Sequence, residues 1–208
     1  MPIYNLSNFN STDNVRLLVW ELTESIVELQ SQLFEIDKKE LETRVSDKRK
    51  LEFVGVRVAL KALLGKEVCI KYDENGKPFL KDGSFHISVS HSGRWIVVMA
   101  HSNRFVGVDI EIPTDKIQKL APRFLGAAEQ VELSDCLNMK QLQLAWSAKE
   151  ALYKIIGNEA VDFAKQLRIF PFEVKSHGEI MAEHSPKKKQ FKLQYIQLPE
   201  FTLVYCLD

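Results

Sequence analysis

Hydrophobic residues near the start of the chain recur at three- and four-residue steps, which is the period of an amphipathic helix. One such run predicts a helix over residues 23–39. A second run predicts a helix over residues 51–64, in a stretch rich in Lys and Arg, with Gly65 as its stop signal. The chain is therefore predicted to begin with helices.

The period then changes to alternation, which is typical of β-strands. Turn residues at 75–78 and Ser-Gly and Ser-Asn pairs separate the alternating runs. Strands are predicted at residues 68–72, 85–90, 95–100 and 105–112. Short connections of this kind favour an antiparallel meander.

The rest of the chain repeats that order of elements. Helical material is predicted over residues 127–156, and strands follow at residues 169–175, 179–184, 191–197 and 201–207. The pattern predicts an α+β protein of two similar halves, residues 1–103 and 104–208. Their junction is short and lacks a Gly/Ser- or Pro-rich linker, so we expect the halves to pack together.

Composition narrows the class of protein. The 208 residues include 28 Lys plus Arg and 28 Asp plus Glu, so the formal charge is zero and a general nucleic-acid binder is not expected. Hydrophobic residues at 45% and charged residues at 27% are typical of a folded globular chain. The first ten residues lack the pattern of a signal peptide, and no run is long enough for a membrane span, so we expect a soluble, cytoplasmic protein.

The cysteines do not indicate a disulfide framework or a zinc site. Cys69, Cys136 and Cys206 form an odd number and lack CxxC spacing. We interpret them as thiols in a reducing compartment.

Two acidic side chains stand out on a predicted strand. Asp109 and Glu111 are two residues apart, so they point to one face, roughly 7 Å from each other. Carboxylates of this kind suit Mg²⁺, which commonly uses one or two of them together with substrate phosphates. The alternative is the polar outer face of an edge strand.

Two further clusters carry candidate chemistry. Glu150 and Lys154 lie one turn apart on a predicted helix, where a simple surface ion pair is the alternative. In the segment 85–93, a strand ends in hydroxyl residues, His91 and a glycine, a composition able to line a polar pocket. His91 could donate to a phosphate oxygen, and a solvated loop histidine is the alternative.

Taken together, these clusters resemble a known family. Gly76-Lys77-Pro78, His91-Ser-Gly93, Gly107-Val-Asp109-Ile-Glu111 and Trp146-Ser-x-Lys149-Glu150-Ala-x-x-Lys154 follow one another along the chain. Their order, residues and spacing resemble the 4′-phosphopantetheinyl transferase superfamily, and most closely its surfactin-synthetase-activating type. That type is a single chain folded as two similar α+β halves, an intramolecular pseudo-dimer.

The resemblance implies a reaction. In the family, coenzyme A binds in the cleft between the halves and a divalent metal holds its diphosphate. The phosphopantetheine group passes to a serine hydroxyl of an apo acyl, peptidyl or polyketide carrier protein, and adenosine 3′,5′-bisphosphate is released. The metal is expected to be Mg²⁺, or Mn²⁺ in its place, and a monomer is expected to suffice.

The resemblance also implies roles for individual residues. Asp109, Glu111 and Glu150 match the metal ligands. Glu150, directly or through a metal-bound water, matches the proposed general base, and Lys154 would stabilise charge on the transferred phosphate or protonate the leaving group. The matches for coenzyme A contacts are Lys77, Pro78, Ser90, His91 and Lys149.

The 3′-phosphate contact is less closely defined. The family uses an Arg of its first helical region, and Arg49 is our first candidate because a guanidinium binds phosphate bidentately, with Lys48, Lys50 and Arg57 as the other candidates. For each of them, a solvated basic helix face is the alternative. Asn158 stands where the family usually has a basic residue. The segment 114–137 is the expected carrier-docking region, with Arg123, Phe124 and Leu125 as its candidate contacts, and a structural role for them is the alternative.

Two alternatives to a transferase stay open. One is a homologue that binds coenzyme A without turnover. The other is a non-enzymatic α+β interaction module whose acidic pairs only decorate its surface.

Overall fold

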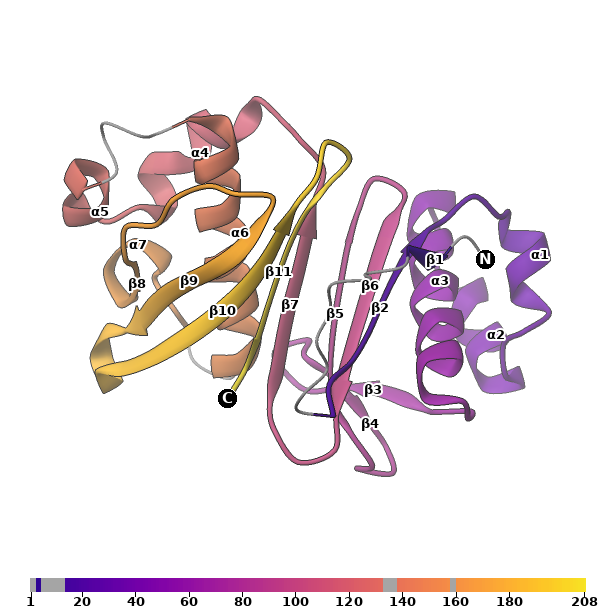
Figure 1. The fold of residues 1–208 in the computed structure, drawn as a ribbon. Helices are drawn as coiled ribbons and strands as arrows, with labels where there is room; N and C mark the ends of the chain where they lie inside the picture. The colour runs from indigo at the N-terminus through magenta and orange to yellow at the C-terminus, as the bar shows by residue number, and fades with distance from the viewer. Residues whose placement is uncertain (1–2, 5–13, 133–137, 158–159) are drawn as a thin grey trace. The chain divides into compact units, whose positions relative to one another are not determined.

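The computed structural model describes residues 3–4, 14–132, 138–157 and 160–208. Contacts divide the chain into two compact units, Met1–Asn103 and Arg104–Asp208 (Figure 1). Asn158 lies outside the described residues. So do residues 133–137 of the expected docking segment, which include Cys136. No helix in the described ranges is long and apolar enough to cross a membrane.

Unit 1 is an antiparallel sheet with helices on it. The sheet has the order β1-β2-β6-β5, and a separate hairpin pairs β3 with β4. The elements are β1 Ile3–Tyr4, β2 Arg16–Glu21, α1 Ile26–Gln30, α2 Glu35–Glu42, α3 Asp47–Leu64, β3 Ile70–Tyr72, β4 Pro78–Leu80, β5 His86–Ser92 and β6 Trp95–His101.

The long helix α3 provides much of the core of unit 1. Ser46 caps its first turn by accepting from the backbone N–H of Arg49, and Gly65 ends it in the left-handed region at φ 66°. Its buried face packs against β2 and β6, and Val54, Ala59 and Leu60 are fully buried there. The predicted helix over residues 51–64 is thus confirmed, with one more turn at its start.

The single helix predicted over residues 23–39 is wrong. Two short helices occupy this stretch, because α1 begins with a capping box between Ser25 and Glu28 and ends at Ser31, and α2 starts only after Phe34. Leu29 at the end of α1 and Leu33 in the connection to α2 are both buried, so the hydrophobic period continues through a turn. A three- to four-residue period therefore did not by itself guarantee one continuous helix.

Unit 2 combines a five-stranded antiparallel sheet of order β7-β11-β10-β9-β8 with four helices among its described residues. The elements are β7 Val106–Glu111, α4 Lys116–Phe124, α5 Ala127–Glu132, α6 Met139–Ile156, α7 Phe163–Gln166, β8 Leu167–Ile169, β9 His177–His184, β10 Lys189–Gln197 and β11 Thr202–Leu207. A 3-10 turn at Ser185–Lys187 joins β9 to β10.

One predicted strand of unit 2 is mostly absent. The run 169–175 contributes only Ile169, the last residue of β8, to the sheet. Pro171 lacks the N–H that a ladder needs, which accounts for the early end of the strand. Because every strand pairing described is antiparallel and helices pack on both main sheets, the α+β class is confirmed.

Helix α6 lies across β7 and β11 (Figure 1). Asn138 caps its start, and its buried face includes Leu144, Ala148 and Leu152. Gly107 on β7 makes the contact close, because a Cβ at this position would stand 2.0 Å from the carbonyl oxygen of Ala151. The glycine thus sets how near the helix backbone comes to the strand that carries Asp109 and Glu111.

Candidate active site: carboxylates of β7 and α6

The two acids of β7 point toward α6. Alternation along the strand places Gly107, Asp109 and Glu111 on one face, and Gly107 is in contact with the α6 backbone. Asp109 is only 3% exposed. The alternative of a polar outer strand face is therefore wrong, although β7 is an edge strand of its sheet.

Lys154 joins the helix to the strand. Its Nζ donates to Asp109 Oδ1 at 2.9 Å and to the carbonyl oxygen of Val108 at 2.8 Å. The ammonium is thus directed at β7, and a simple surface ion pair with Glu150 does not describe its contacts.

Glu150 lies within the field of both strand acids. Burial raises its pKa to about 7, and the negative charges of Asp109 and Glu111 act in the same direction, whereas Lys154 lowers it. Three carboxylates and the ammonium of Lys154 thus lie near one another in a partly buried place.

Glu111 is held by α6 as well. Trp146 Nε1 donates to Glu111 Oε1 at 3.3 Å, and Gln143 Nε2 donates to the carbonyl oxygens of Glu111 and Ile112 at 3.3 and 2.7 Å. Sequence reasoning assigned no role to Gln143 or Trp146. The signal was available, since residues 143, 146, 150 and 154 recur at the spacing of one helix face.

The donor set fits a hard divalent cation in its chemistry. Burial and the charges of Asp109 and Glu111 raise the pKa of Glu150, and a nearby Mg²⁺, which prefers oxygen ligands, would stabilise three carboxylates in this arrangement. In the described part of the chain, no group of three or more acidic, His or Cys side chains is arranged as a ready ligand cage. Each strand acid instead accepts from α6 at one of its oxygens, Asp109 Oδ1 from Lys154 Nζ and Glu111 Oε1 from Trp146 Nε1.

Lys149, one residue before Glu150, has a different environment. Its side chain is 0% exposed, and its Nζ donates to Glu129 Oε2 and to the carbonyl oxygens of Phe124, Phe163 and Leu167 at 2.6 to 2.9 Å. Its predicted contact with coenzyme A is therefore corrected. A side chain enclosed in this way holds α4, α5, α7 and β8 onto α6.

Glu129 completes this buried pair. Besides Lys149, its carboxylate accepts from the backbone N–H groups of Gly126 and Ile169, both at 2.7 Å. Burial lowers the pKa of Lys149, and the charge of Glu129 opposes that shift. No sequence signal singled out Glu129.

The candidate phosphate contacts Arg49 and His91 share a neighbour in unit 1. Arg49 NH1 lies 3.9 Å from Glu52 Oε2, and His91 Nδ1 lies 3.5 Å from Glu52 Oε1. The Arg49 side chain is 71% exposed, so it can reach a ligand. Helix α3 and strand β5 thus bring together two residues that are far apart in sequence.

The other predicted contacts of unit 1 lie on two strands and a turn. Lys77 is in the turn between β3 and β4, where burial lowers its pKa and Asp73 opposes that shift, and Pro78 begins β4. Ser90 is buried on β5, and the alternation of the strand turns it to the face opposite His91.

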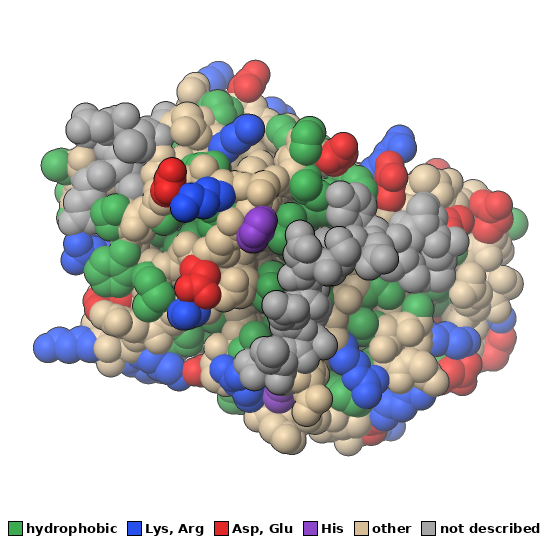
Figure 2. Space-filling model, viewed as in Figure 1, with side chains coloured by type: hydrophobic (Ala, Val, Ile, Leu, Met, Phe, Trp, Pro, Cys, Tyr) green, Lys and Arg blue, Asp and Glu red, His purple; other side chains and the backbone are tan. Residues whose placement is uncertain are grey.

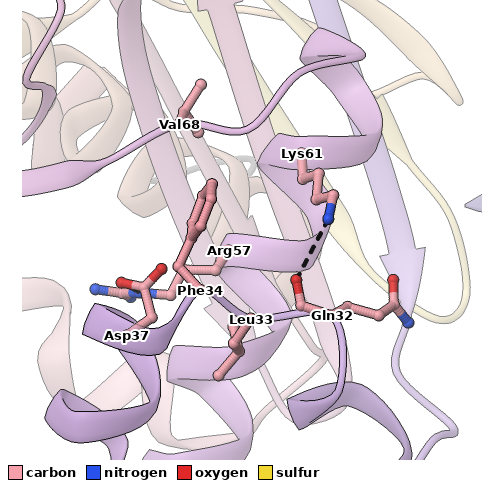
Figure 3. A pocket seen from close by; sticks show the side chains of 7 residues that line it. All are labelled: Gln32, Leu33, Phe34, Asp37, Arg57, Lys61 and Val68. Carbon is pink, nitrogen blue, oxygen red and sulfur yellow. Dashed lines mark hydrogen bonds and ion pairs between the residues drawn. The ribbon is translucent and has the colours of Figure 1, made fainter.

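Arg57, an alternative to Arg49 as the 3′-phosphate contact, is buried in unit 1. Its Nε donates to Asp37 Oδ1 at 2.8 Å, and both side chains are buried. Figure 3 shows both among the side chains that line a small pocket. The guanidinium also lies over the ring of Phe53, 3.3 Å from its centroid. Arg57 is therefore not available to a phosphate.

The expected docking segment contains helix α4. Arg123 is exposed on it, whereas Phe124 and Leu125 are each 1% exposed and belong to an apolar cluster with Leu142 and Ala145. The two apolar residues are thus core residues, and they are not a contact surface in this structure. Charged side chains of both signs occur across the visible face of the protein (Figure 2).

Comparison with known proteins points to one family. Residues 105–206 match the family model of the 4′-phosphopantetheinyl transferase superfamily. A 4′-phosphopantetheinyl transferase of Aneurinibacillus migulanus, gsp, is 32% identical over 126 residues, which are 51% of this chain and 52% of that protein. Another from Bacillus subtilis is 31% identical over 141 residues, 64% of this chain and 60% of that protein.

A third relative, the 4′-phosphopantetheinyl transferase psf-1 of Bacillus pumilus, is 36% identical over 100 residues, 46% of this chain and 42% of that protein. The chain spans about half the length of the curated relatives it matches. The matched segment contains both β7 and α6, the two elements that bring the carboxylates together.

Proposed function

Through its residues 105–206 this chain belongs to the 4′-phosphopantetheinyl transferase superfamily, and we propose that it transfers 4′-phosphopantetheine from coenzyme A to a serine of an apo carrier protein. The observation that carries the proposal is the cluster of Asp109, Glu111 and Glu150 with Lys154, which lies inside the matched segment. Surface decoration would leave these acids exposed, whereas Asp109 is buried and Glu111 and Glu150 are partly buried.

In the proposed reaction, the serine Oγ attacks the phosphorus that carries the pantetheine arm. A new P–O bond forms, the P–O bond to the adenosine bisphosphate breaks, and its electron pair leaves with adenosine 3′,5′-bisphosphate. The serine proton passes to the carboxylate of Glu150. A general base works best with a pKa near the working pH, and burial raises the pKa of Glu150 to about 7 in the metal-free protein.

Lys154 is proposed to stabilise the negative charge of the transferred phosphate. Its ammonium lies between the strand and the helix, 2.9 Å from Asp109, and is 24% exposed, so it can also face a phosphate oxygen. A fixed positive charge there would stabilise the charge that develops on the transferred group. Phosphoryl transfer depends mainly on such positioning and charge neutralisation.

Asp109, Glu111 and Glu150 would hold the divalent cation, which we propose to be Mg²⁺. When bound, the cation neutralises the diphosphate of coenzyme A. Because Lys154 and Trp146 contact Asp109 and Glu111, cation binding requires these contacts to loosen or to be shared. We keep Arg49, Lys77, Pro78, Ser90 and His91 as the proposed coenzyme A contacts, and we propose a cytoplasmic monomer.

The proposal is tested by intact-mass spectrometry of a panel of purified apo carrier proteins incubated with this protein, coenzyme A and Mg²⁺. We expect one phosphopantetheine mass to be added to at least one carrier. The Glu150→Gln variant should lose about 100-fold or more of the rate, since it removes the base but keeps the shape.

Two outcomes would contradict the proposal. Saturable coenzyme A binding without transfer to any carrier would favour the binding-only homologue. Neither binding nor transfer would favour the non-enzymatic interaction module.

A further inference from the structure

Trp146 makes a directed contact with one acid of the carboxylate cluster. Its Nε1 donates to Glu111 Oε1 at 3.3 Å, from one turn of α6 before Glu150. A hydrogen bond to an ionised acceptor is stronger than one between neutral groups, and it depends on direction. The indole therefore favours one orientation of the Glu111 carboxylate.

The Trp146 ring is itself held in place. The ring of Phe124 stands nearly edge-on to it at 5.2 Å between centroids, and the ring of Phe163 is tilted against it at 5.8 Å. These rings come from α4 and α7, so two further elements fix the indole. Edge and tilted arrangements are the favoured geometries for aromatic pairs.

The main chain at Glu111 is fixed by the same helix face. Gln143, which is only 4% exposed, donates to the carbonyl oxygens of Glu111 and Ile112 just where β7 ends. Side chain and backbone of this one residue are thus both held from α6. These two contacts fix both the position and the direction of the Glu111 carboxylate, which a surface charge alone would not require.

We propose that Trp146 is a positioning residue, which orients the Glu111 carboxylate toward a divalent cation. The inference rests on the proposed function, because that function supplies the cation. Groups that hydrogen-bond to ligands orient them, and their loss typically weakens metal binding by about 10- to 100-fold. One carboxylate oxygen can accept the indole N–H while the group still coordinates through its other lone pairs.

The test is a Mg²⁺ titration of the full chain by calorimetry in the presence of coenzyme A. The Trp146→Phe variant keeps an aromatic ring against Phe124 and Phe163 but lacks the donor. We expect its dissociation constant for Mg²⁺ to rise about 10-fold or more, with a raised half-saturating Mg²⁺ concentration in transfer assays and a smaller change in kcat.

The matched control is Trp20→Phe. Trp20 is fully buried in the core of unit 1, and its Nε1 has no hydrogen-bond partner among the described residues. This variant makes the same change of ring without removing a hydrogen bond. It should bind Mg²⁺ with the affinity of the unchanged protein, whatever it does to thermal stability.

A second measurement needs no substitution at Trp146. The chain has three tryptophans, so nuclear magnetic resonance should show three indole N–H signals. Addition of Mg²⁺ should shift one of them, and Glu111→Gln should abolish that shift.

Equal Mg²⁺ affinity of Trp146→Phe and the unchanged protein, or the absence of any indole shift, would overturn this inference and leave the proposed transferase intact. A failure of the unchanged protein to bind Mg²⁺ and to transfer the group would overturn both.

Discussion

Two neighbouring residues of α6, Lys149 and Glu150, differ in the charges that surround them. On one side of the helix, Lys149 is enclosed and its charge is matched by Glu129 and three carbonyl oxygens. On the other side, burial raises the pKa of Glu150, as do the nearby carboxylates of Asp109 and Glu111, whereas the nearby ammonium of Lys154 lowers it. The first side thus pairs one ammonium with one carboxylate, whereas the second brings three carboxylates near the ammonium of Lys154.

The difference shows what distinguishes a site from a structural pair on the same helix. A buried pair whose donors and acceptors match needs no ligand, and breaking it leaves an uncompensated charge. A cluster of neighbouring carboxylates is stabilised when a proton or a cation is added. The Glu150 side is therefore the side that we assign to chemistry.

The largest expected effect is on the Lys149 side of α6. Lys149→Met should lower the free energy of unfolding by about 3–5 kcal/mol, because it leaves the buried carboxylate of Glu129 without its partner. Urea unfolding followed by circular dichroism measures this change.

The control for this variant is Lys165→Met on α7. The Lys165 side chain is 83% exposed, so its loss should change the free energy of unfolding by less than about 0.5 kcal/mol. Equal effects of the two substitutions would show that the Lys149 pair is not structural.

The second largest expected effect is that the free energy of unfolding depends on pH through the titration of Glu150. Its folded pKa is raised from 4.5 to about 7, so between these values the unfolded chain loses the proton first. Stability of the metal-free protein should therefore fall as pH rises through this window, by up to about 3 kcal/mol. Below pH 4.5 the penalty is absent.

Glu150→Gln should remove this contribution. The variant should be more stable than the unchanged protein at pH 8 in the absence of metal, and the advantage should shrink at pH 5. Chemical unfolding of both proteins at the two pH values gives the comparison. A difference that does not depend on pH would contradict the raised pKa.

A smaller effect is expected from Lys154→Met. Asp109 is buried and would lose the ammonium 2.9 Å away, which should cost about 2 kcal/mol in metal-free protein. Because a cation can replace the lost charge, saturating Mg²⁺ should recover part of this stability. A loss that Mg²⁺ leaves unchanged would argue against a cation at Asp109.

Much of this arrangement could be predicted from local patterns. The alternation of β7 placed Asp109 and Glu111 on one face, and the helical period placed Glu150 and Lys154 one turn apart. What local patterns could not supply was the meeting of the two elements. That depends on the close packing at Gly107, which involves residues more than forty positions apart.

The error at Lys149 has a physical cause. The motif places Lys149 beside Glu150 in sequence, but adjacent residues of a helix point in directions about 100° apart. The contacts of Lys149 are accordingly with α4, α5, α7 and β8, whereas Glu150 lies near the acids of β7. The breaks near Ser31 and Pro171 were missed because hydrophobic residues continue past each of them, buried Leu33 after Ser31 and partly buried Phe172 and Val174 after Pro171.

The most direct test of the difference between the two sides of α6 is the effect of Mg²⁺ on thermal unfolding at pH 8. We predict that Mg²⁺ raises the unfolding midpoint of the unchanged protein and of Glu129→Gln, but not that of Glu111→Gln/Glu150→Gln. An equal Mg²⁺-dependent rise in that double variant would contradict the assignment of the cation to the carboxylates of β7 and α6.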